Sequence, residues 1–202
     1  MPALAWLVVA YLLGSVPAAL IAGRWLKGID LREHGSGNLG ATNVYRVLGA
    51  GAAAAVLAFD IAKGVVPVLC FPQWATGPAQ PWWPIAFGVA AIVGHIRPIY
   101  LGGRGGGKGV ATATGVFIAL APMPMVLAIG VWIAVLALTK YVSLASVTAA
   151  LSLPVAVAIW NGPRGALLPG EAAVALFVVW THRANLSRLS RGIESRIGRP
   201  GR

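Results

Sequence analysis

The chain has 202 residues, of which 58% are hydrophobic and only 10% are charged. Soluble domains carry about 25% charged residues, so this composition excludes an ordinary soluble protein and indicates a helical membrane protein. The formal net charge of +11 favours an anionic lipid surface or an anionic substrate. Nucleic-acid binding is not expected, because the basic residues lie in short loops between apolar runs and form no basic and aromatic stripe.

Long apolar runs predict an all-α fold, a polytopic integral membrane helical bundle with about seven transmembrane helices. We expect these helices to form a single domain over residues 1–202. The first run contains no Lys or Arg before Arg24, so we interpret it as a retained span and not as a cleaved signal peptide. The runs cover residues 3–23, 47–71, 82–99, 109–121, 123–139, 142–160 and 168–181.

The fourth and fifth runs are separated only by Pro122-Met123-Pro124. Each proline lacks an N–H group and crowds the preceding turn, so we expect a tight hairpin here and not one long helix. With both spans present, all of the 16 Lys and Arg residues except Lys63 and Arg164 fall on one side of the membrane. Basic loops stay in the cytoplasm, which places the N-terminus outside and the C-terminus in the cytoplasm.

Three polar segments then share the predicted cytoplasmic face, and the first is HGSGNLGATNVYR, residues 34–46. An arginine such as Arg46 can hold a phosphate or carboxylate through two hydrogen bonds. The side chains of Ser36 and Asn38 can bond hydroxyl groups or phosphate oxygens. The alternative is a purely structural role, in which Thr42 or Asn43 caps the start of the second helix.

The second segment is GGRGGGKGVAT, residues 102–112. Glycines allow backbone N–H groups to turn toward an anion, Lys108 adds a positive charge, and the N-terminus of the fourth span follows directly. This combination predicts a phosphate-binding loop. It is not an ATP-binding P-loop, because Gly109 stands where that pattern needs Ser or Thr. The alternative is a flexible linker with a lysine at the membrane surface.

The third segment is THRANLSRLSRGIE, residues 181–194. His182, Asn185 and Arg188 are three residues apart, so in a helix they share one face. The alternative is an amphipathic surface helix whose arginines contact anionic lipid head groups. The arginines considered for that lipid contact are Arg191, Arg196, Arg199 and Arg202.

Asp60 and Lys63 lie inside the second predicted span, where charges are costly and are normally paired. Their i, i+3 spacing favours a structural ion pair over direct support of a site. The single cysteine, Cys70, excludes an intramolecular disulfide. No metal site is predicted, because the three histidines are far apart in the sequence.

Taken together, HGSGNLGATNVYR, GHIRPIYLGGRGGGKGVAT and HRANLSRLSRGIE resemble the three motifs of the bacterial PlsY-type acyl-phosphate:glycerol-3-phosphate acyltransferases. The stretch Asp60-Ile-Ala-Lys63-Gly64 is similar to that family's second-span pattern. The resemblance implies an enzyme of phospholipid biosynthesis in the bacterial inner membrane, with its active site at the cytoplasmic face. Such an enzyme moves a fatty acyl group from acyl phosphate to the 1-hydroxyl of glycerol 3-phosphate, giving lysophosphatidic acid and phosphate without a cofactor.

The motifs also imply which residues carry the reaction. Asp60, Lys63 and Glu194 are expected to be structural. The predicted catalytic residues are Ser36, Arg46, Lys108 and His182. The predicted substrate-binding residues are Ser36, Asn38, Asn43, Arg46, Gly105, Gly106, Gly107, Lys108, His182, Asn185 and Arg188.

The sequence departs from the family pattern in three places. The loop has one residue more than usual between His95 and Lys108, Gly103 replaces a phenylalanine, and Thr181 replaces an arginine. The extra glycine is expected to loosen the loop and to change which amides contact phosphate. The expected partners are the two phosphorylated substrates and membrane lipids, and the sequence carries no indication of oligomeric state.

Two other functions are compatible with the pattern. A transporter of an anionic phosphate ester also uses polar loops in a helical bundle, but neither polar loop has a counterpart in a second half of the chain. A lipid-binding scaffold would have no particular need of Lys108 or Arg46.

Overall fold

The computed structural model describes residues 1–162 and 168–198, and within them every regular element is helical. The chain divides into two compact units, Met1–Leu120 and Ala121–Arg202. Three basic residues of the predicted loops and tail, Arg164, Arg199 and Arg202, lie outside the described residues.

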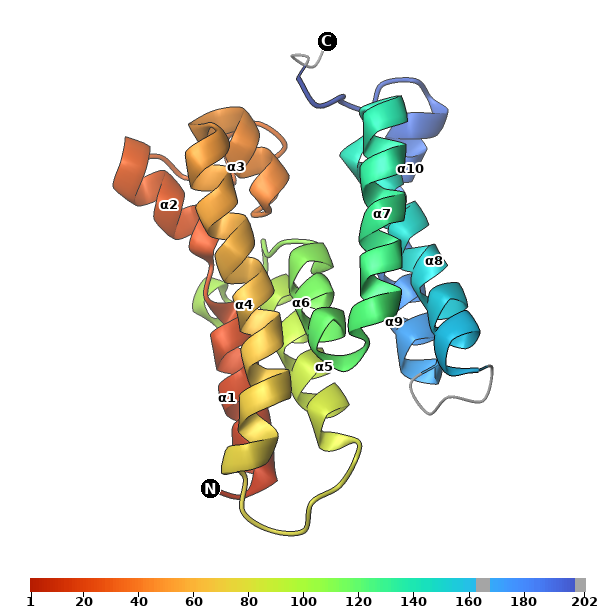
Figure 1. Cartoon of the computed structure of the whole chain (residues 1–202). Helices are drawn as coiled ribbons and strands as arrows, with labels where there is room; N and C mark the ends of the chain where they lie inside the picture. Colours follow the sequence, from red (N-terminus) through yellow and green to blue (C-terminus); the bar gives the residue numbers. More distant parts are fainter. Residues whose placement is uncertain (163–167, 199–202) are drawn as a thin grey trace. The chain divides into compact units, whose positions relative to one another are not determined.

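The first unit contains six α-helices and one 3₁₀ turn (Figure 1). Helix α1 packs against α5, and α4 packs against α5 and α6. The elements are α1 (Ala3–Ser15), α2 (Ala18–Lys27), α3 (Ala41–Leu48), α4 (Ala50–Trp74), α5 (Trp83–Ile96), η1 (Ile99–Leu101) and α6 (Val110–Leu120).

Helices α1 and α5 approach each other through glycines on both partners. A Cβ atom at Gly14 would overlap the carbonyl group of Ala91, and one at Gly94 would overlap the carbonyl oxygen of Tyr11. Small residues let helix backbones pack closely where lipid provides no hydrophobic driving force. The pairing of α1 with α5 therefore depends on the absence of a side chain at these two positions.

The α4–α6 contact repeats this arrangement. A Cβ atom at Gly64 would overlap the carbonyl oxygen of Thr112, and one at Gly115 would overlap that of Ile61. This close packing fixes the start of α6, and with it the end of the glycine-rich loop, against the middle of α4.

The first two predicted spans differ from the observed helices at the ends that border the loop between them. The run 3–23 is not one helix, because Pro17 lacks an N–H and disfavours helical backbone at Val16, so α1 ends at Ser15 and α2 begins at Ala18. The second span begins at Ala50 and not at residue 47, because Gly49, with φ of +92°, separates α4 from the short helix α3.

The second unit contains α7 (Pro122–Thr139), α8 (Val142–Asn161), α9 (Leu168–Thr181) and α10 (Arg183–Ser190). Helix α8 packs against both α7 and α9. The predicted break at the proline pair is confirmed, because one helix ends at Leu120 and the next begins at Pro122. The prolines occupy the first turn of α7, where a missing N–H leaves no helical hydrogen bond unmade.

Within the described residues, five helical stretches are long and apolar enough to cross a membrane. They cover residues 3–27, 50–74, 83–101, 122–139 and 142–161. Two shorter apolar helices, Val110–Leu120 and Pro169–Thr181, account for the other two predicted runs. The described residues therefore form an all-helical fold whose long apolar helices are suited to a membrane, as predicted.

Candidate functional site

The loop before α3 is held together by the side chain of Asn43. Its Oδ1 atom accepts a hydrogen bond from the Ser36 amide at 2.8 Å, and its Nδ2 atom donates to the carbonyl oxygens of Leu31 and His34 at 3.2 and 3.0 Å. Asn43 is only 1% exposed. The amide can make all these bonds because it carries both donors and an acceptor.

The alternative interpretation, in which Thr42 or Asn43 caps the start of a helix, is wrong. Gly40 is the N-cap of α3, without a side-chain hydrogen bond, and Thr42 and Asn43 lie inside the first turn. Asn43 reaches back to the loop and fixes its path. This geometry favours a positioning role for Asn43 over the predicted direct contact with substrate.

Buried apolar side chains anchor the same loop to the core. Leu31, Leu39 and Val44 are buried and pack in one cluster with Val56 of α4. Burying an aliphatic side chain contributes about 1.5–3 kcal/mol. The polar residues between Leu31 and Leu39 are therefore held at the surface by flanking apolar anchors.

A short-range ion pair precedes the loop. The Arg32 side chain donates to both carboxylate oxygens of Asp30, at 2.6 to 3.2 Å, and the Arg32 amide donates to Oδ1 at 2.9 Å. These hydrogen bonds lower the pKa of Asp30 to about 2. Asp30 therefore neutralises part of the positive charge of this loop at all physiological pH values.

The glycine-rich loop uses its glycines in two different ways. Gly102, Gly103 and Gly105 have φ values of +64°, +74° and +73°, in the region that favours glycine. Gly106 and Gly107 serve close approach instead, since a Cβ atom at Gly106 would overlap the carbonyl oxygens of His95 and Ile96, and one at Gly107 the His95 ring. The loop is therefore seated directly on the end of α5.

Two of the three predicted polar segments meet in the first unit. The Asn38 Nδ2 atom lies 3.5 Å from the Gly106 carbonyl oxygen, although the residues are 68 positions apart. Gly105 lies beside the aliphatic part of the Arg32 side chain. The loop before α3 and the glycine-rich loop thus form one continuous polar surface, which we call the two-loop surface and define as residues 30–40 and 102–108.

Two of the predicted catalytic side chains belong to this surface, where Ser36 is exposed and Lys108 is half-buried. Arg46 is exposed on α3, the helix that follows the first loop. Lys108 stands two residues before the first turn of α6, which begins at Val110, one residue later than the predicted run. Backbone N–H groups at a helix start favour anions, so the positive groups of this surface are suited to phosphate.

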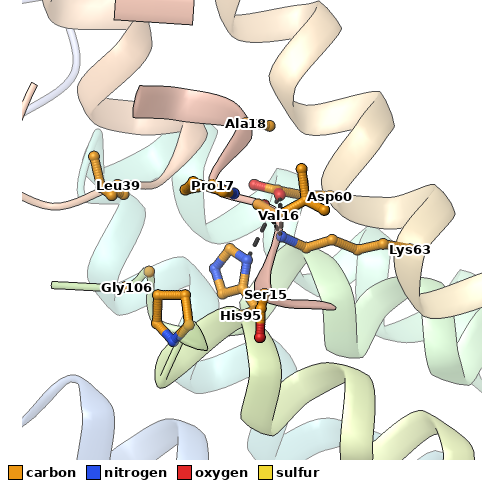
Figure 2. A pocket seen from close by; sticks show the side chains of 11 residues that line it. Ser15, Val16, Pro17, Ala18, Leu39, Asp60, Lys63, His95 and Gly106 are labelled. Atoms are coloured by element: carbon orange, nitrogen blue, oxygen red, sulfur yellow. Dashed lines mark hydrogen bonds and ion pairs between the residues drawn. The ribbon is translucent and has the colours of Figure 1, made fainter. Parts of the chain in front are cut away.

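A buried polar cluster lies beneath the two-loop surface (Figure 2). The Lys63 Nζ atom is 2.7 Å from the Asp60 Oδ1 atom and donates to the Val16 carbonyl oxygen at 3.3 Å. Both charged side chains are 2% exposed. The predicted ion pair is confirmed. Lys63 has a further partner in the Val16 carbonyl group, which lies outside a helix because of the break between α1 and α2.

Sequence reasoning assigned no role to His95, which completes this cluster. Its Nδ1 atom lies 3.5 Å from the Asp60 Oδ1 atom, and the residue is 7% exposed. The available signal was its place at the end of an apolar run, directly before the glycine-rich segment. Within residues 1–162 and 168–198, no group of His, Cys, Asp and Glu side chains is arranged to hold a metal ion.

The third segment lies in the second unit and begins with His182, the N-cap of α10. Its Nδ1 atom is 2.8 Å from the Val178 carbonyl oxygen. Because a carbonyl only accepts, Nδ1 carries the proton, and the neutral ring then has its lone pair on Nε2. His182 is only 3% exposed.

Glu194 organises the rest of this segment. It accepts hydrogen bonds from Asn185 Nδ2 at 2.7 Å, Ser143 Oγ at 2.8 Å and Arg188 Nε at 2.8 Å. Burial alone would raise the pKa of the Glu194 carboxyl, but these hydrogen bonds and the Arg188 charge hold it below its ordinary value. Asn185 and Arg188, predicted to share one helix face, both donate to Glu194. These contacts fit the predicted structural role of Glu194.

The family model for glycerol-3-phosphate acyltransferase matches residues 4–192. The chain belongs to this family. A relative from Prochlorococcus marinus, named glycerol-3-phosphate acyltransferase, is 49% identical over 95% of this chain and 93% of its own length. A relative of the same name from Desulforudis audaxviator is 47% identical, over 93% of this chain and 92% of its own.

Two solved structures agree with this assignment. Both are crystal structures of PlsY, an integral membrane glycerol 3-phosphate acyltransferase, one in its glycerol 3-phosphate form and one in its lysophosphatidic acid form. They are 37% and 36% identical to this chain, with TM-scores of 0.86, and cover 97% of it, while it covers 96% and 95% of them. The protein is thus a membrane enzyme that transfers an acyl group to glycerol 3-phosphate.

Proposed function

We propose that the acyl donor is acyl phosphate and that both phosphorylated substrates bind at the two-loop surface. The observation that carries this proposal is the contact between Asn38 and Gly106, which joins the loop bearing Ser36 to the loop bearing Lys108. Two phosphate groups repel each other unless cations and N–H groups surround both. The chain supplies 16 basic against 5 acidic residues, and the ionised Asp30 is already engaged by Arg32.

The two loops divide the binding task. Ser36, Asn38 and Arg46 hold one phosphate group, with Arg46 in a bidentate contact. The amides of Gly105, Gly106 and Gly107 hold the other, together with the ammonium group of Lys108. Asn43 acts through the loop, since its side chain is bonded to the backbone of Ser36, Leu31 and His34.

The third segment supplies the remaining residues that we propose to contact substrate. His182 orients the 1-hydroxyl of glycerol 3-phosphate through Nε2, because Nδ1 is bonded to Val178. Asn185 and Arg188 add polar contacts to the substrate at the edge of the Glu194 cluster.

The reaction is a direct acyl transfer. The glycerol hydroxyl oxygen attacks the carbonyl carbon of acyl phosphate, the carbon–oxygen bond to phosphate breaks, and the phosphate leaves with its electron pair. A phosphate oxygen of the donor takes the hydroxyl proton, so the products are lysophosphatidic acid and hydrogen phosphate. Acyl phosphate is already activated, so the protein supplies position and charge stabilisation in place of a strong base.

The membrane arrangement follows the charge pattern. We place the enzyme in the bacterial inner membrane as one domain with seven spans, the N-terminus outside and the C-terminus in the cytoplasm. The support is that the five long apolar helical stretches and the two shorter ones together match the seven predicted runs. Cysteines introduced at residues 108 and 196, each in a Cys70→Ser background, test this with an impermeant thiol reagent. Labelling of the two from opposite sides would contradict the proposal.

The decisive test is an assay of the purified protein with palmitoyl phosphate and glycerol 3-phosphate. We expect phosphate release that depends on both substrates, and no product when palmitoyl-CoA replaces the donor. Lys108→Ala and Arg46→Ala are expected to lower kcat/KM about 100-fold or more, as removal of one preorganised charge-stabilising group does. A protein that only moved glycerol 3-phosphate across vesicles, without phosphate release, would be a transporter.

The role of His182 is tested separately. His182→Ala is expected to reduce turnover modestly and to leave the pH dependence of kcat in place, because the donor phosphate takes the proton. A steep loss of turnover with unchanged substrate affinity, rescued by added imidazole, would instead identify His182 as the general base.

A further inference from the structure

We propose that His95 is a positioning residue that transmits the fixed geometry of the buried Asp60–Lys63 pair to the glycine-rich loop. The inference rests on the proposed role of that loop in phosphate binding. It assigns a function to a histidine and an ion pair that touch no substrate in the scheme above.

The first step is the rigidity of the ion pair. Asp60 and Lys63 stand one turn apart on α4, 2.7 Å from each other, and Lys63 also binds the Val16 carbonyl oxygen at 3.3 Å. Both residues are 2% exposed. A charged pair inside a membrane helix is costly and persists where it is well satisfied, so Asp60 presents its carboxylate at a fixed point.

The second step is the orientation of the His95 ring. Nδ1 lies 3.5 Å from Asp60 Oδ1, and Figure 2 shows the ring turned toward that carboxylate. A neutral ring that donates from Nδ1 has its unprotonated Nε2 atom on the opposite side. The carboxylate thus selects both the rotation of the ring and the position of its proton, as the outer partner of a metal-binding histidine does.

The third step is the contact between His95 and the loop. The Nε2 edge of the ring faces Gly107 so closely that a Cβ atom there would overlap Nε2 and lie within 3.0 Å of Cδ2. The Gly107 amide also donates to the His95 carbonyl oxygen at 3.2 Å. His95 therefore touches the residue before Lys108 through its side chain and through its backbone.

The fourth step concerns the space between the ion pair and the loop, where the His95 ring lies. A small cavity lies between the ion pair and the loop, and Asp60, Lys63, His95, Gly106 and Gly107 are among its lining residues. The imidazole crosses this space and is held at one end by charge. An aliphatic side chain would fill the same space, but it could not be oriented by the carboxylate.

Three variants test the role of the ring in the two-substrate assay. His95→Leu is expected to raise the KM for a phosphorylated substrate about 10-fold or more while kcat changes less. His95→Asn keeps an N–H donor toward Asp60 and is expected to recover part of the lost affinity. Asp60→Asn, which removes the charge that orients the ring, is expected to change KM in the same direction as His95→Leu.

A double-mutant cycle tests the contact itself. Gly107→Ala places a methyl group against the His95 ring and is expected to lower kcat/KM strongly in the wild-type background. In a His95→Ala background that space is open, so the same substitution is expected to cost little further. Gly51→Ala is the matched control, since a Cβ atom at Gly51 meets no neighbour and its effect should be the same in both backgrounds.

The outcomes separate the two proposals. A wild-type protein that releases no phosphate from acyl phosphate contradicts the proposed function. An active wild type whose His95→Leu variant keeps its KM values, or whose Gly107 and His95 effects simply add, overturns the positioning role alone. If none of the His95 variants elutes as a monodisperse folded protein in detergent, the residue is a structural requirement and the inference is also overturned.

Discussion

The loop before α3 and the C-terminal segment after α10 are both held in place by hydrogen bonds to one side chain, but the chemistry of that side chain differs. Each is an irregular segment that one buried side chain ties to several partners. In the first the side chain is the neutral amide of Asn43, which donates twice and accepts once. In the second it is the carboxylate of Glu194, which only accepts, from Ser143, Asn185 and Arg188.

This difference decides how each segment responds to its surroundings. An amide has no titratable proton, so the Asn43 contacts are independent of pH. The Glu194 contacts require the ionised carboxylate and are strengthened by its charge. The Asn43 contacts of the loop that carries Ser36 therefore do not change with pH, whereas the C-terminal segment after α10 depends on pH and on salt.

The largest effect is expected from Asn43→Asp. The new carboxylate can still accept from the Ser36 amide, but it faces the Leu31 and His34 carbonyl oxygens without a donor. We expect a loss of about 2–4 kcal/mol in the free energy of unfolding, measured by thermal unfolding in detergent. Asn161→Asp, at an exposed helix end, is the control. A similar loss in both variants would contradict the role given to Asn43.

A smaller effect is expected from Glu194→Gln. The neutral side chain can still accept from Asn185 or Ser143, but it loses the ion pair with Arg188, whose side chain is 39% exposed. Because solvent screens that charge, we expect a loss of about 1 kcal/mol. Glu33→Gln, at an exposed position, should leave the unfolding midpoint unchanged. Equal unfolding midpoints for Glu194→Gln and Glu33→Gln would contradict the view that Glu194 holds its segment as Asn43 holds the first loop.

The same carboxylate predicts a pH dependence. Because folding lowers the pKa of Glu194 below its ordinary value of 4.5, its stabilisation is complete above pH 4.5 and is lost as the pH falls through the lower native pKa. The difference in unfolding midpoint between wild type and Glu194→Gln should therefore shrink between pH 6 and pH 3. The Glu33→Gln protein serves as the comparison, and a gap independent of pH would show that Glu194 acts by shape alone.

The smallest effect is expected from Asp30→Asn. Its partner Arg32 is 40% exposed, and surface ion pairs contribute roughly 0–1 kcal/mol. The difference from wild type should decrease further in high salt. A change as large as that of Asn43→Asp would mean that charge, and not the buried amide, sets the conformation of the first loop.

Much of the fold could be predicted because its signals are local. Apolar run length predicts the helices, and Pro122 marks the start of α7 because proline is accepted in a first turn. The i, i+3 spacing of Asp60 and Lys63 predicts their ion pair for the same reason. Pro17 carried an equally local signal, and the break that it causes between α1 and α2 was missed only because the run around it is uniformly apolar.

The features of the site that the sequence did not predict depend on how the helices cross. His95 reaches Asp60 because α5 packs beside α4, and neither residue contains information about that crossing. Asn43 shows the same limit: its polar neighbours suggested a cap or a ligand, whereas its partners are backbone groups brought near by the turn at Gly35 and Gly37. The glycines of the loop were predicted for their backbone freedom, yet Gly106 and Gly107 are needed for the space that they leave.

The glycines between the packed helices of the first unit carry a consequence for how this sequence can vary. Gly14, Gly64, Gly94 and Gly115 each face a carbonyl group of a neighbouring helix with no room for a methyl group. In a library of random variants selected for growth, these four positions should tolerate as little change as Lys108, although none of them bears a functional group. A survey of intolerant positions would therefore overstate the size of the catalytic centre unless folded yield were scored beside survival.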